Sequence, residues 1–324
     1  MAKNTNTPIE LPFLGSAYEG RSKSLNAQQS INLFPVLDRN EESKSVVAMY
    51  NTPGLVEFSD TGTSAIVRSI HVMRDKLYAV VGNTVYEVTT EGVATSLGVI
   101  TTSTGHVGMA TNGTQLLIVD GTDSGHLVVG GVLVDIADTD FPAATDCIFF
   151  DGYFVVTVLN TGKIQISKLY DGLSWDPLDF ATAEASPDNL VGIGSTQQNI
   201  WLFGDHTIEI YYNSGNVDFP FQRVPGGIID IGCLSLTSLS QIEGVLYWLT
   251  DERTVVKSNG YGFEVISTTG INYQISTYDT VDDAVGYTYT SEGFIFYVLD
   301  FPTENKTWVC NAKTFMWHEW SSVI

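Results

Sequence analysis

The sequence repeats one pattern six times between residues 75 and 310. In each repeat a small or turn residue precedes a short apolar run, which leads through a polar turn into a second run. Examples are "DKLYAVVGNTVYEV" from Asp75 and "QNIWLFGDHTIEIYY" from Gln198. The equivalent apolar positions are Tyr78, Leu116, Val155, Trp201, Tyr247 and Phe296. Their separations of about 38 to 49 residues are typical of β-propeller blades, each of which has four short strands.

The repeat therefore predicts an all-β fold, namely a β-propeller of six blades with four antiparallel strands each. The expected blades span roughly residues 61–104, 105–138, 139–188, 189–231, 232–270 and 271–324. Residues 1–60 lack the repeat and are predicted to form an extended N-terminal arm. Its segment Val46–Phe58 is a candidate to supply a closing strand, because an unpaired sheet edge invites aggregation. The alternative, two stacked β-sandwiches, fits the even repeat less well.

Composition restricts the environment and the partners. The 324 residues are 44% hydrophobic, which is typical of a folded globular chain. No apolar run approaches the roughly 20 residues of a membrane helix, and the N-terminus has no secretory pattern, so we expect folding in the cytosol and no membrane partner. Cys147, Cys233 and Cys310 lie far apart, as expected of reduced core thiols. The formal charge of −22 disfavours tight binding to DNA phosphates, although DNA can pass nearby without sticking.

The segment Asp171–Asp188, "DGLSWDPLDFATAEASPD", gathers five carboxylates and no basic residue. Paired carboxylates can hydrolyse glycosides, clustered ones can hold a metal, and scattered ones form turns. The preceding "ISKLYDGLSW" resembles the Asp box of sialidases, a turn motif, but its spacing is broken. We therefore expect a structural loop in which Trp175 covers the blade and Asp171 accepts hydrogen bonds from backbone amides.

Other catalytic patterns have little support. The six arginines do not recur at equivalent points of successive repeats, as a sialidase-like carboxylate site would require. The five histidines occur singly, without the spacing of metal ligands. No phosphate loop, nucleophile motif or EF-hand order is present. We predict no catalytic, metal-binding or cofactor-binding residues, and a protein that is not an enzyme.

Several segments together resemble a known protein family. They include "SAYEGRSKSLNAQQSINLFPV", "NTPGL", "DTDFPAATDCIFFDGYFV", the acidic segment, "WLFGDHTIEIYYNSGNVDFPFQRVPGG", "GCLSLTSLS" and "TFMWHEW". In this order, from about Leu11 to Trp320, they are similar to the packaged-DNA stabilisation proteins, or tail accessory factors, of short-tailed bacteriophages. The resemblance implies a propeller that forms a hexameric ring beneath the portal and its adaptor ring. Such a ring retains packaged DNA, carries tailspikes or fibres, leads to the tail needle or tip, and passes DNA at ejection.

The resemblance also implies a location in the virion, with assembly in the host cytoplasm. Family members often continue past "HEWSSVI", so we expect a shorter relative or a fragment. Candidate partner or subunit contacts are Tyr18, Arg21, Asn32, Phe34, Pro35, Trp175, Asp176, Phe219 and Phe221. Removing residues 11–35 is expected to preserve folding and abolish the ring. A carbohydrate-active propeller, hydrolytic or glycan-binding, and a generic protein-binding scaffold are the alternatives.

Overall fold

The computed structural model describes residues 18–19, 27–28, 30–37, 47–184, 186 and 188–321. The chain divides into two compact units. Unit 1 combines residues 1–54 with residues 266–324, and unit 2 is Leu55–Val265. Within the described ranges, six sheets have four antiparallel strands each, in simple sequence order. The protein is a six-bladed β-propeller, so the fold predicted from the repeat is confirmed.

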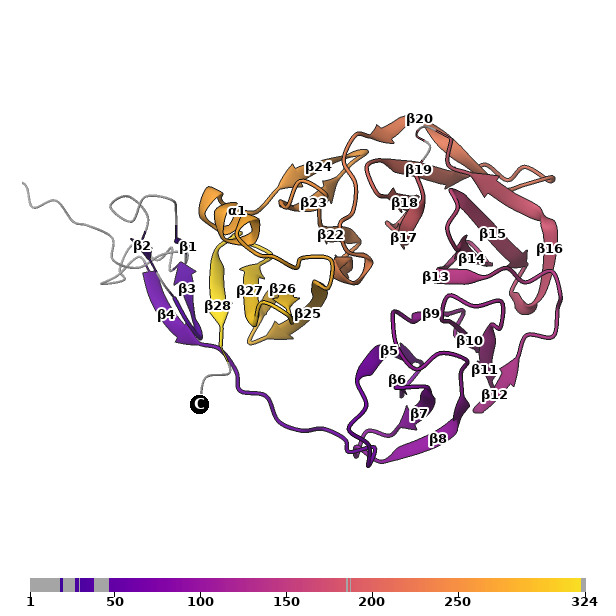
Figure 1. The fold of residues 1–324 in the computed structure, drawn as a ribbon, viewed down its shortest axis with the longest axis horizontal. Coiled ribbons are helices and arrows are strands. Elements are labelled where there is room, and N and C mark those ends of the chain that lie inside the picture. The colour runs from indigo at the N-terminus through magenta and orange to yellow at the C-terminus, as the bar shows by residue number, and fades with distance from the viewer. Residues whose placement is uncertain are drawn as a thin grey trace, which may run out of the picture. The chain divides into compact units, whose positions relative to one another are not determined.

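Unit 2 contains blades one to five (Figure 1). Blade one is β5 (Val67–Met73), β6 (Lys76–Val81), β7 (Thr84–Val88) and β8 (Ala94–Val99). Blade two is β9 (Gly108–Thr111), β10 (Gln115–Val119), β11 (His126–Val129) and β12 (Val132–Asp135). Blade three is β13 (Ala144–Phe150), β14 (Tyr153–Val158), β15 (Lys163–Lys168) and β16 (Asp171–Thr182).

Blade four is β17 (Leu190–Ser195), β18 (Ile200–Gly204), β19 (Ile208–Asn213) and β20 (Phe221–Ile229). Blade five is β21 (Ser240–Ile242), β22 (Val245–Leu249), β23 (Val255–Asn259) and β24 (Gly262–Val265), preceded by the 3₁₀ turn Leu236–Ser238. The first strands β5, β9, β13 and β17 contact one another in sequence and lie on the inner side of unit 2 in Figure 1. The fourth strands are therefore the outer strands of their blades.

Unit 1 contains blade six and the described parts of the N-terminal arm. Blade six is β25 (Val285–Ser291), β26 (Phe294–Phe301), β27 (Lys306–Asn311) and β28 (Trp317–Trp320), preceded by helix α1 (Thr269–Ser276). The arm contributes two small hairpins, β1 (Tyr18–Glu19) with β2 (Ala27–Gln28), and β3 (Leu33–Leu37) with β4 (Val47–Asn51). The candidate closing segment thus pairs, over β4, with β3 and not with a blade.

Burial of the second strands explains why the repeat can be recognised in the sequence. In unit 2, the second strands of blades two, three and four have hydrogen-bonded neighbours on both edges and a packed blade on each face, so they read as continuous apolar runs. All residues of β18 are buried, for example. The cores lie between blades: Trp201 and Phe203 of blade four pack against Trp248 of blade five, with ring centroids 6.1 and 5.3 Å from Trp248.

Two-residue turns fix the register of three hairpins. Asp151-Gly152, Glu243-Gly244 and Glu292-Gly293 each connect the first and second strands of a blade. All six residues have positive φ, between 47° and 90°. Positive φ at both central residues defines the type I′ turn, whose twist matches that of the flanking strands, and glycine meets this demand at the second position without steric cost.

Candidate functional site

The acidic segment is the outer strand of blade three over most of its length. The expectation of a loop is wrong for Asp171–Thr182, which forms β16 and pairs with β15. Gln165 pairs with Phe180 while Ser167 pairs with Trp175, so the residues between Trp175 and Phe180 form a bulge. The bulge accommodates Pro177, which has no N–H to donate to a ladder. Leu178, at its tip, is 79% exposed.

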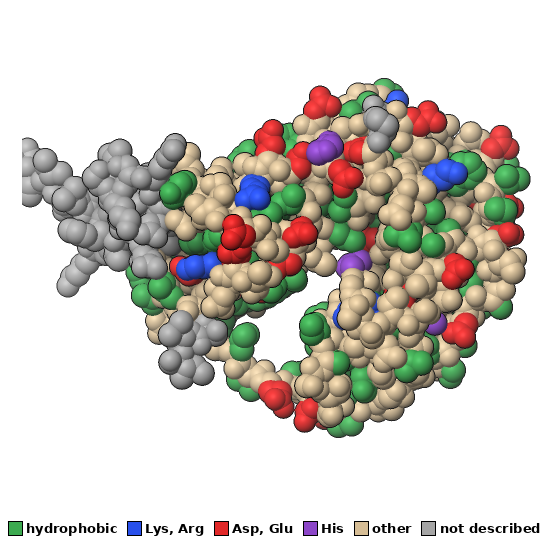
Figure 2. All heavy atoms as spheres, viewed as in Figure 1, with side chains coloured by type: hydrophobic (Ala, Val, Ile, Leu, Met, Phe, Trp, Pro, Cys, Tyr) green, Lys and Arg blue, Asp and Glu red, His purple; other side chains and the backbone are tan. Residues whose placement is uncertain are grey.

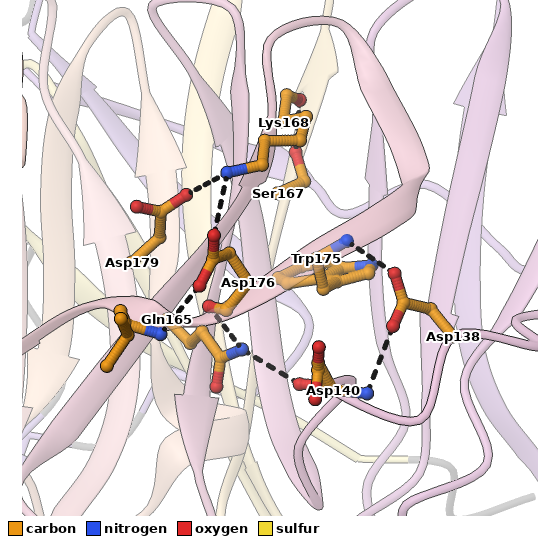
Figure 3. Close-up of polar contacts among 9 residues, drawn as sticks. Asp138, Asp140, Gln165, Ser167, Lys168, Trp175, Asp176 and Asp179 are labelled. Carbon is orange, nitrogen blue, oxygen red and sulfur yellow. Dashed lines mark hydrogen bonds and ion pairs between the residues drawn. The ribbon is translucent and has the colours of Figure 1, made fainter.

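Polar contacts hold this bulge in place (Figure 3). Lys168 Nζ lies 2.7 Å from Asp179 Oδ2 and 3.3 Å from Asp176 Oδ2. Gln165 Nε2 donates to the carbonyl oxygens of Asp140 (2.9 Å) and Asp176 (3.1 Å). These contacts join the bulge to β15 and to the segment before blade three. The acids of the bulge therefore act as hydrogen-bond acceptors and ion-pair partners within the fold.

Two carboxyl groups at this bulge and beside it, Asp176 and Asp138, have pKa shifts that do not suit acid catalysis. Backbone amides of Trp175 and Asp140 hold the pKa of Asp138 below its usual range. The backbone amide of Leu178, together with Lys168, lowers the pKa of Asp176 in the same way. A general acid at neutral pH needs the opposite shift. Among the residues that the structure describes, no group of three His, Cys, Asp or Glu side chains could hold a metal ion.

The two packing roles expected in this segment are confirmed. Trp175 is 4% exposed, packs edge-on against Phe141 with centroids 5.0 Å apart, and donates from Nε1 to the carbonyl oxygen of Gly172. Asp171 Oδ1 accepts from the amide of Leu173 at 3.0 Å. The buried Trp175 is thus a packing residue of this subunit, while Asp176 remains partly exposed and able to meet a partner.

The arm is joined to the end of blade six through Asn32. Its N–H donates to the carbonyl oxygen of Glu319 (2.8 Å), Nδ2 donates to that of Ser321 (2.9 Å), and Oδ1 accepts from the amide of Ser321 (3.0 Å). The neighbouring Ser30 carbonyl oxygen accepts from the amide of Glu319. Asn32 has φ 54°, a conformation that asparagine tolerates better than most residues. The predicted contact residue Asn32 therefore makes its observed contacts within the subunit.

Phe34 completes the core of blade six. It is 5% exposed and clusters with Phe296, Val298 and Val309, with its ring 5.1 Å from that of Phe296. Pro35 beside it is also buried. Deletion of residues 11–35 would remove Phe34 and Pro35 and empty part of this core, so this geometry argues against the expectation that the deletion leaves folding intact.

The remaining predicted contacts are scattered. Phe221 is 2% exposed and packs against Phe150 and Tyr153, whereas Phe219, just before β20, is half-buried. Tyr18 belongs to β1, and Arg21 lies outside the described residues. The structure brings Asn32, Phe34 and Pro35 together, and Trp175 and Asp176 together, but it does not assemble the whole set into one site.

The sequence did not predict a cluster of hydrogen bonds that joins blades one and two. The Arg68 guanidinium donates to the carbonyl oxygens of Gly82, Thr102, Thr104 and Gly105 at 2.7 to 2.9 Å. Asp120 accepts from the amide and hydroxyl of the same Thr102, both at 2.8 Å. The only signal in the sequence was a single arginine within an otherwise uncharged strand.

A second set of polar contacts joins blades two, three and four. Asp146 on β13 is 8% exposed; its Oδ1 lies 3.4 Å from His106 Nε2, and its Oδ2 accepts from the amide of Ile193 at 3.2 Å. It is the only carboxylate on the first strands β5, β9, β13, β17, β21 and β25. Exposed carboxylates instead lie on turns and outer strands, and Figure 2 shows them spread over this face of unit 2, with few Lys or Arg side chains between them.

Comparison with family models identifies the family of this chain. Residues 9–322 match the model described as "Bacteriophage P22 Gp10, beta-propeller". The chain belongs to this family. The membership supports a structural, tail-associated propeller protein of a bacteriophage, in agreement with the resemblance found in the sequence. Comparison with curated protein sequences gives no match. Among the described residues, no helix is long and apolar enough to cross a membrane.

The similarity of this chain to solved structures supports the propeller fold and nothing more specific. At 12% identity and a TM-score of 0.51, 80% of the chain aligns with 82% of YCF48, solved bound to D1 peptide. The designed protein Ika8 gives 11% identity and a TM-score of 0.51 over 94% of this chain and 89% of that one. PorZ of Porphyromonas gingivalis, a surface component of the type-IX secretion system, aligns at 10% identity and a TM-score of 0.47, and only 32% of its length is covered.

Proposed function

We propose that this protein is the nozzle or hub subunit of a short-tailed phage tail. Six copies would form a ring that closes the head beneath the portal-adaptor proteins, retains the packaged DNA and passes it at ejection. The ring would also carry tailspikes or fibres and lead to the needle or tip. The observation that carries the proposal is the family match over residues 9–322, which includes both the arm and all six blades.

The distribution of charge supports passage of DNA without binding. The first strands present one carboxylate, the buried Asp146, and the exposed carboxylates of the described residues lie on turns, loops and outer strands. When such surfaces line the bore of a ring, they repel DNA phosphates and the duplex slides. We therefore expect no specific DNA contact, no cofactor, and a role that is mechanical and not catalytic.

Subunit contacts around a ring are head-to-tail, so two different patches of one subunit must meet. The β16 bulge is a suitable patch, because Leu178 is 79% exposed there and the nearby Asp176 and Asp179 are partly exposed. The arm residues Asn32 and Phe34 are engaged within unit 1, so a contact there would use the surface they build and not their side chains.

Electron microscopy of the purified protein tests the proposal. Particles are imaged alone and after mixing with portal-adaptor complexes of the same phage, and are classified by symmetry. We expect six-fold rings in at least the mixed sample. Leu178→Asp should weaken ring formation, while Leu173→Asp, at another exposed position of β16, serves as the matched control. Monomers in both samples, with no protein bound to the adaptor, would contradict the proposal.

A further inference from the structure

A polar groove lies on the surface of unit 2, where blades three, four and five meet. Its volume is about 510 Å³, within the range of small-ligand sites. The β13–β14 turn contributes Asp151, the β17–β18 turn contributes Gln197 and Gln198, and the β23–β24 turn contributes Tyr261. The end of β19 adds Tyr212, and the bulge of β20 forms part of the wall. Neither the fold nor the proposed tail function requires this groove.

Its side chains are available for a ligand. Gln197, Gln198 and Asp151 are exposed, and none of the three makes a side-chain hydrogen bond to another described residue. Each glutamine can donate and accept, and the carboxylate can accept. Tyr261 is 57% exposed and Tyr212 is half-buried, so aromatic rings with polar tips adjoin the amides. The frame is rigid, because Asp151 belongs to a type I′ turn and Tyr212 to a paired strand.

The charges of the groove favour a neutral ligand. Its lining includes no Lys or Arg, so an anionic ligand would meet Asp151 and a net charge of −22 without compensation. A cationic ligand would find one exposed carboxylate, a weak anchor in high dielectric. Amide and hydroxyl groups around aromatic rings suit instead a ligand that presents many hydroxyls on one side and C–H groups on the other.

The backbone disfavours an extended peptide. Peptides commonly bind a propeller or sheet by adding a strand to a free edge. In the groove, β19 is already paired with β18 on one side and β20 on the other. The wall residue Pro225 in the β20 bulge has no N–H to offer. The outer strand β20 keeps a free edge, but its bulge with Pro225 interrupts that edge at the groove, so we expect side chains to supply most of the affinity.

We infer that this groove binds a neutral glycan. Hexose or N-acetylhexosamine units would place their C–H faces against Tyr261 and Tyr212 and their hydroxyls against Gln197, Gln198 and Asp151. The inference goes beyond the proposed tail function and does not depend on ring formation, because every residue involved belongs to unit 2 of a single subunit.

Saturation-transfer difference NMR on the full chain tests the inference. The probes are neutral tetrasaccharides of glucose, mannose, galactose and N-acetylglucosamine, with sulfated counterparts and a mixture of unstructured peptides as comparisons. We expect at least one neutral glycan to bind and none of the comparisons to bind better. In Tyr261→Ala and in Gln198→Ala, the affinity for that glycan should fall about fivefold or more, since both side chains are exposed and their loss spares the fold.

The matched control is Tyr273→Ala, which removes a tyrosine that is 37% exposed on helix α1 and does not line the groove. It should leave glycan affinity unchanged. The inference is overturned by the absence of binding for every neutral glycan at millimolar concentration. It is equally overturned when Tyr261→Ala and Gln198→Ala both bind like the unmodified chain, or when only the peptides or sulfated glycans bind.

Discussion

His318 makes the stability of unit 1 depend on pH. Its ring is fully buried on β28 and contacts Phe34 and Phe296, with centroid distances of 5.8 and 5.9 Å. Neither ring nitrogen has a hydrogen-bond partner among the described residues. Burial penalises the imidazolium form, and it lowers the pKa of His318 from 6.5 to about 3. The folded protein therefore keeps this ring neutral over a range in which the unfolded chain binds a proton.

The sign and size of the effect follow from this difference. Below pH 6.5 the unfolded state gains a proton that the folded state does not gain until about pH 3, so stability falls as the pH falls through this window. At 1.36 kcal/mol per pKa unit, the contribution of His318 costs about 2 kcal/mol at pH 5 relative to pH 8, and about 3 kcal/mol at pH 4. Such losses are a large fraction of a typical unfolding free energy of about 5 to 15 kcal/mol.

Urea unfolding of the protein and of His318→Phe, followed by tryptophan fluorescence at pH 8 and pH 5, measures the effect. The packing cost of phenylalanine is the same at both pH values and cancels, so the variant should lose about 2 kcal/mol less than the unmodified protein between them. The control His206→Gln removes an exposed histidine whose pKa is raised by Asp251. A raised pKa adds stability as the pH falls, so this variant should show the full loss of the unmodified protein or a slightly larger one. Equal pH dependence in the protein and His318→Phe would refute the reasoning.

Three further predictions concern packing and the acidic strand. Phe34→Ala should lower the unfolding free energy by about 3 to 5 kcal/mol, seen as a lower urea midpoint, because it leaves a cavity in the blade-six core; a loss below 1 kcal/mol would contradict this role. Gly232→Ala should abolish soluble folded protein, since a Cβ would lie 1.9 Å from the Asp205 carbonyl oxygen, whereas Gly54→Ala, with nothing within 4 Å, should express and melt normally. Lys168→Ala should cost no more than about 1 kcal/mol in urea unfolding, because its ion pairs are half-exposed; a larger loss would show that they hold the bulge more strongly than a surface pair can.

The second strands were predictable from the sequence because their environment is local to the repeat. The six equivalent positions, from Tyr78 to Phe296, all fall on second strands and all are buried. Where a blade packs on each face, as in blades two to four, apolar residues are needed throughout the strand and give a continuous run. An outer strand such as β16 has one free edge and one exposed face, so Asp176, Pro177 and Asp179 are tolerated there. Its sequence consequently resembles a loop, and its strand character emerges only through pairing with β15.

The candidate sites were less predictable because their partners are distant in sequence. Arg68 donates hydrogen bonds to carbonyl oxygens of residues 14 to 37 positions away. No local sequence pattern indicates which carbonyl groups will lie near it in the folded blade. The groove has the same origin, since Asp151 and Tyr261 come from blades three and five. The blades produce a regular repeat in the sequence. Side chains that meet only because blades pack together show no such regular spacing, so their contacts could not be predicted.

The contacts of the N-terminal arm were the hardest to predict, because their partners are the most distant in the sequence. Asn32 contacts Ser321, 289 positions later in the chain, and Phe34 packs against Phe296, about 260 positions later. Residues 1–54 and 266–324 together build unit 1. Closing so long a loop costs more entropy than forming a hairpin, so we expect these contacts to form after the strands of blade six have paired. A truncation at either end of the chain therefore removes residues of unit 1. A missing arm should appear first as local instability of β26 to β28, before any effect on the five blades of unit 2.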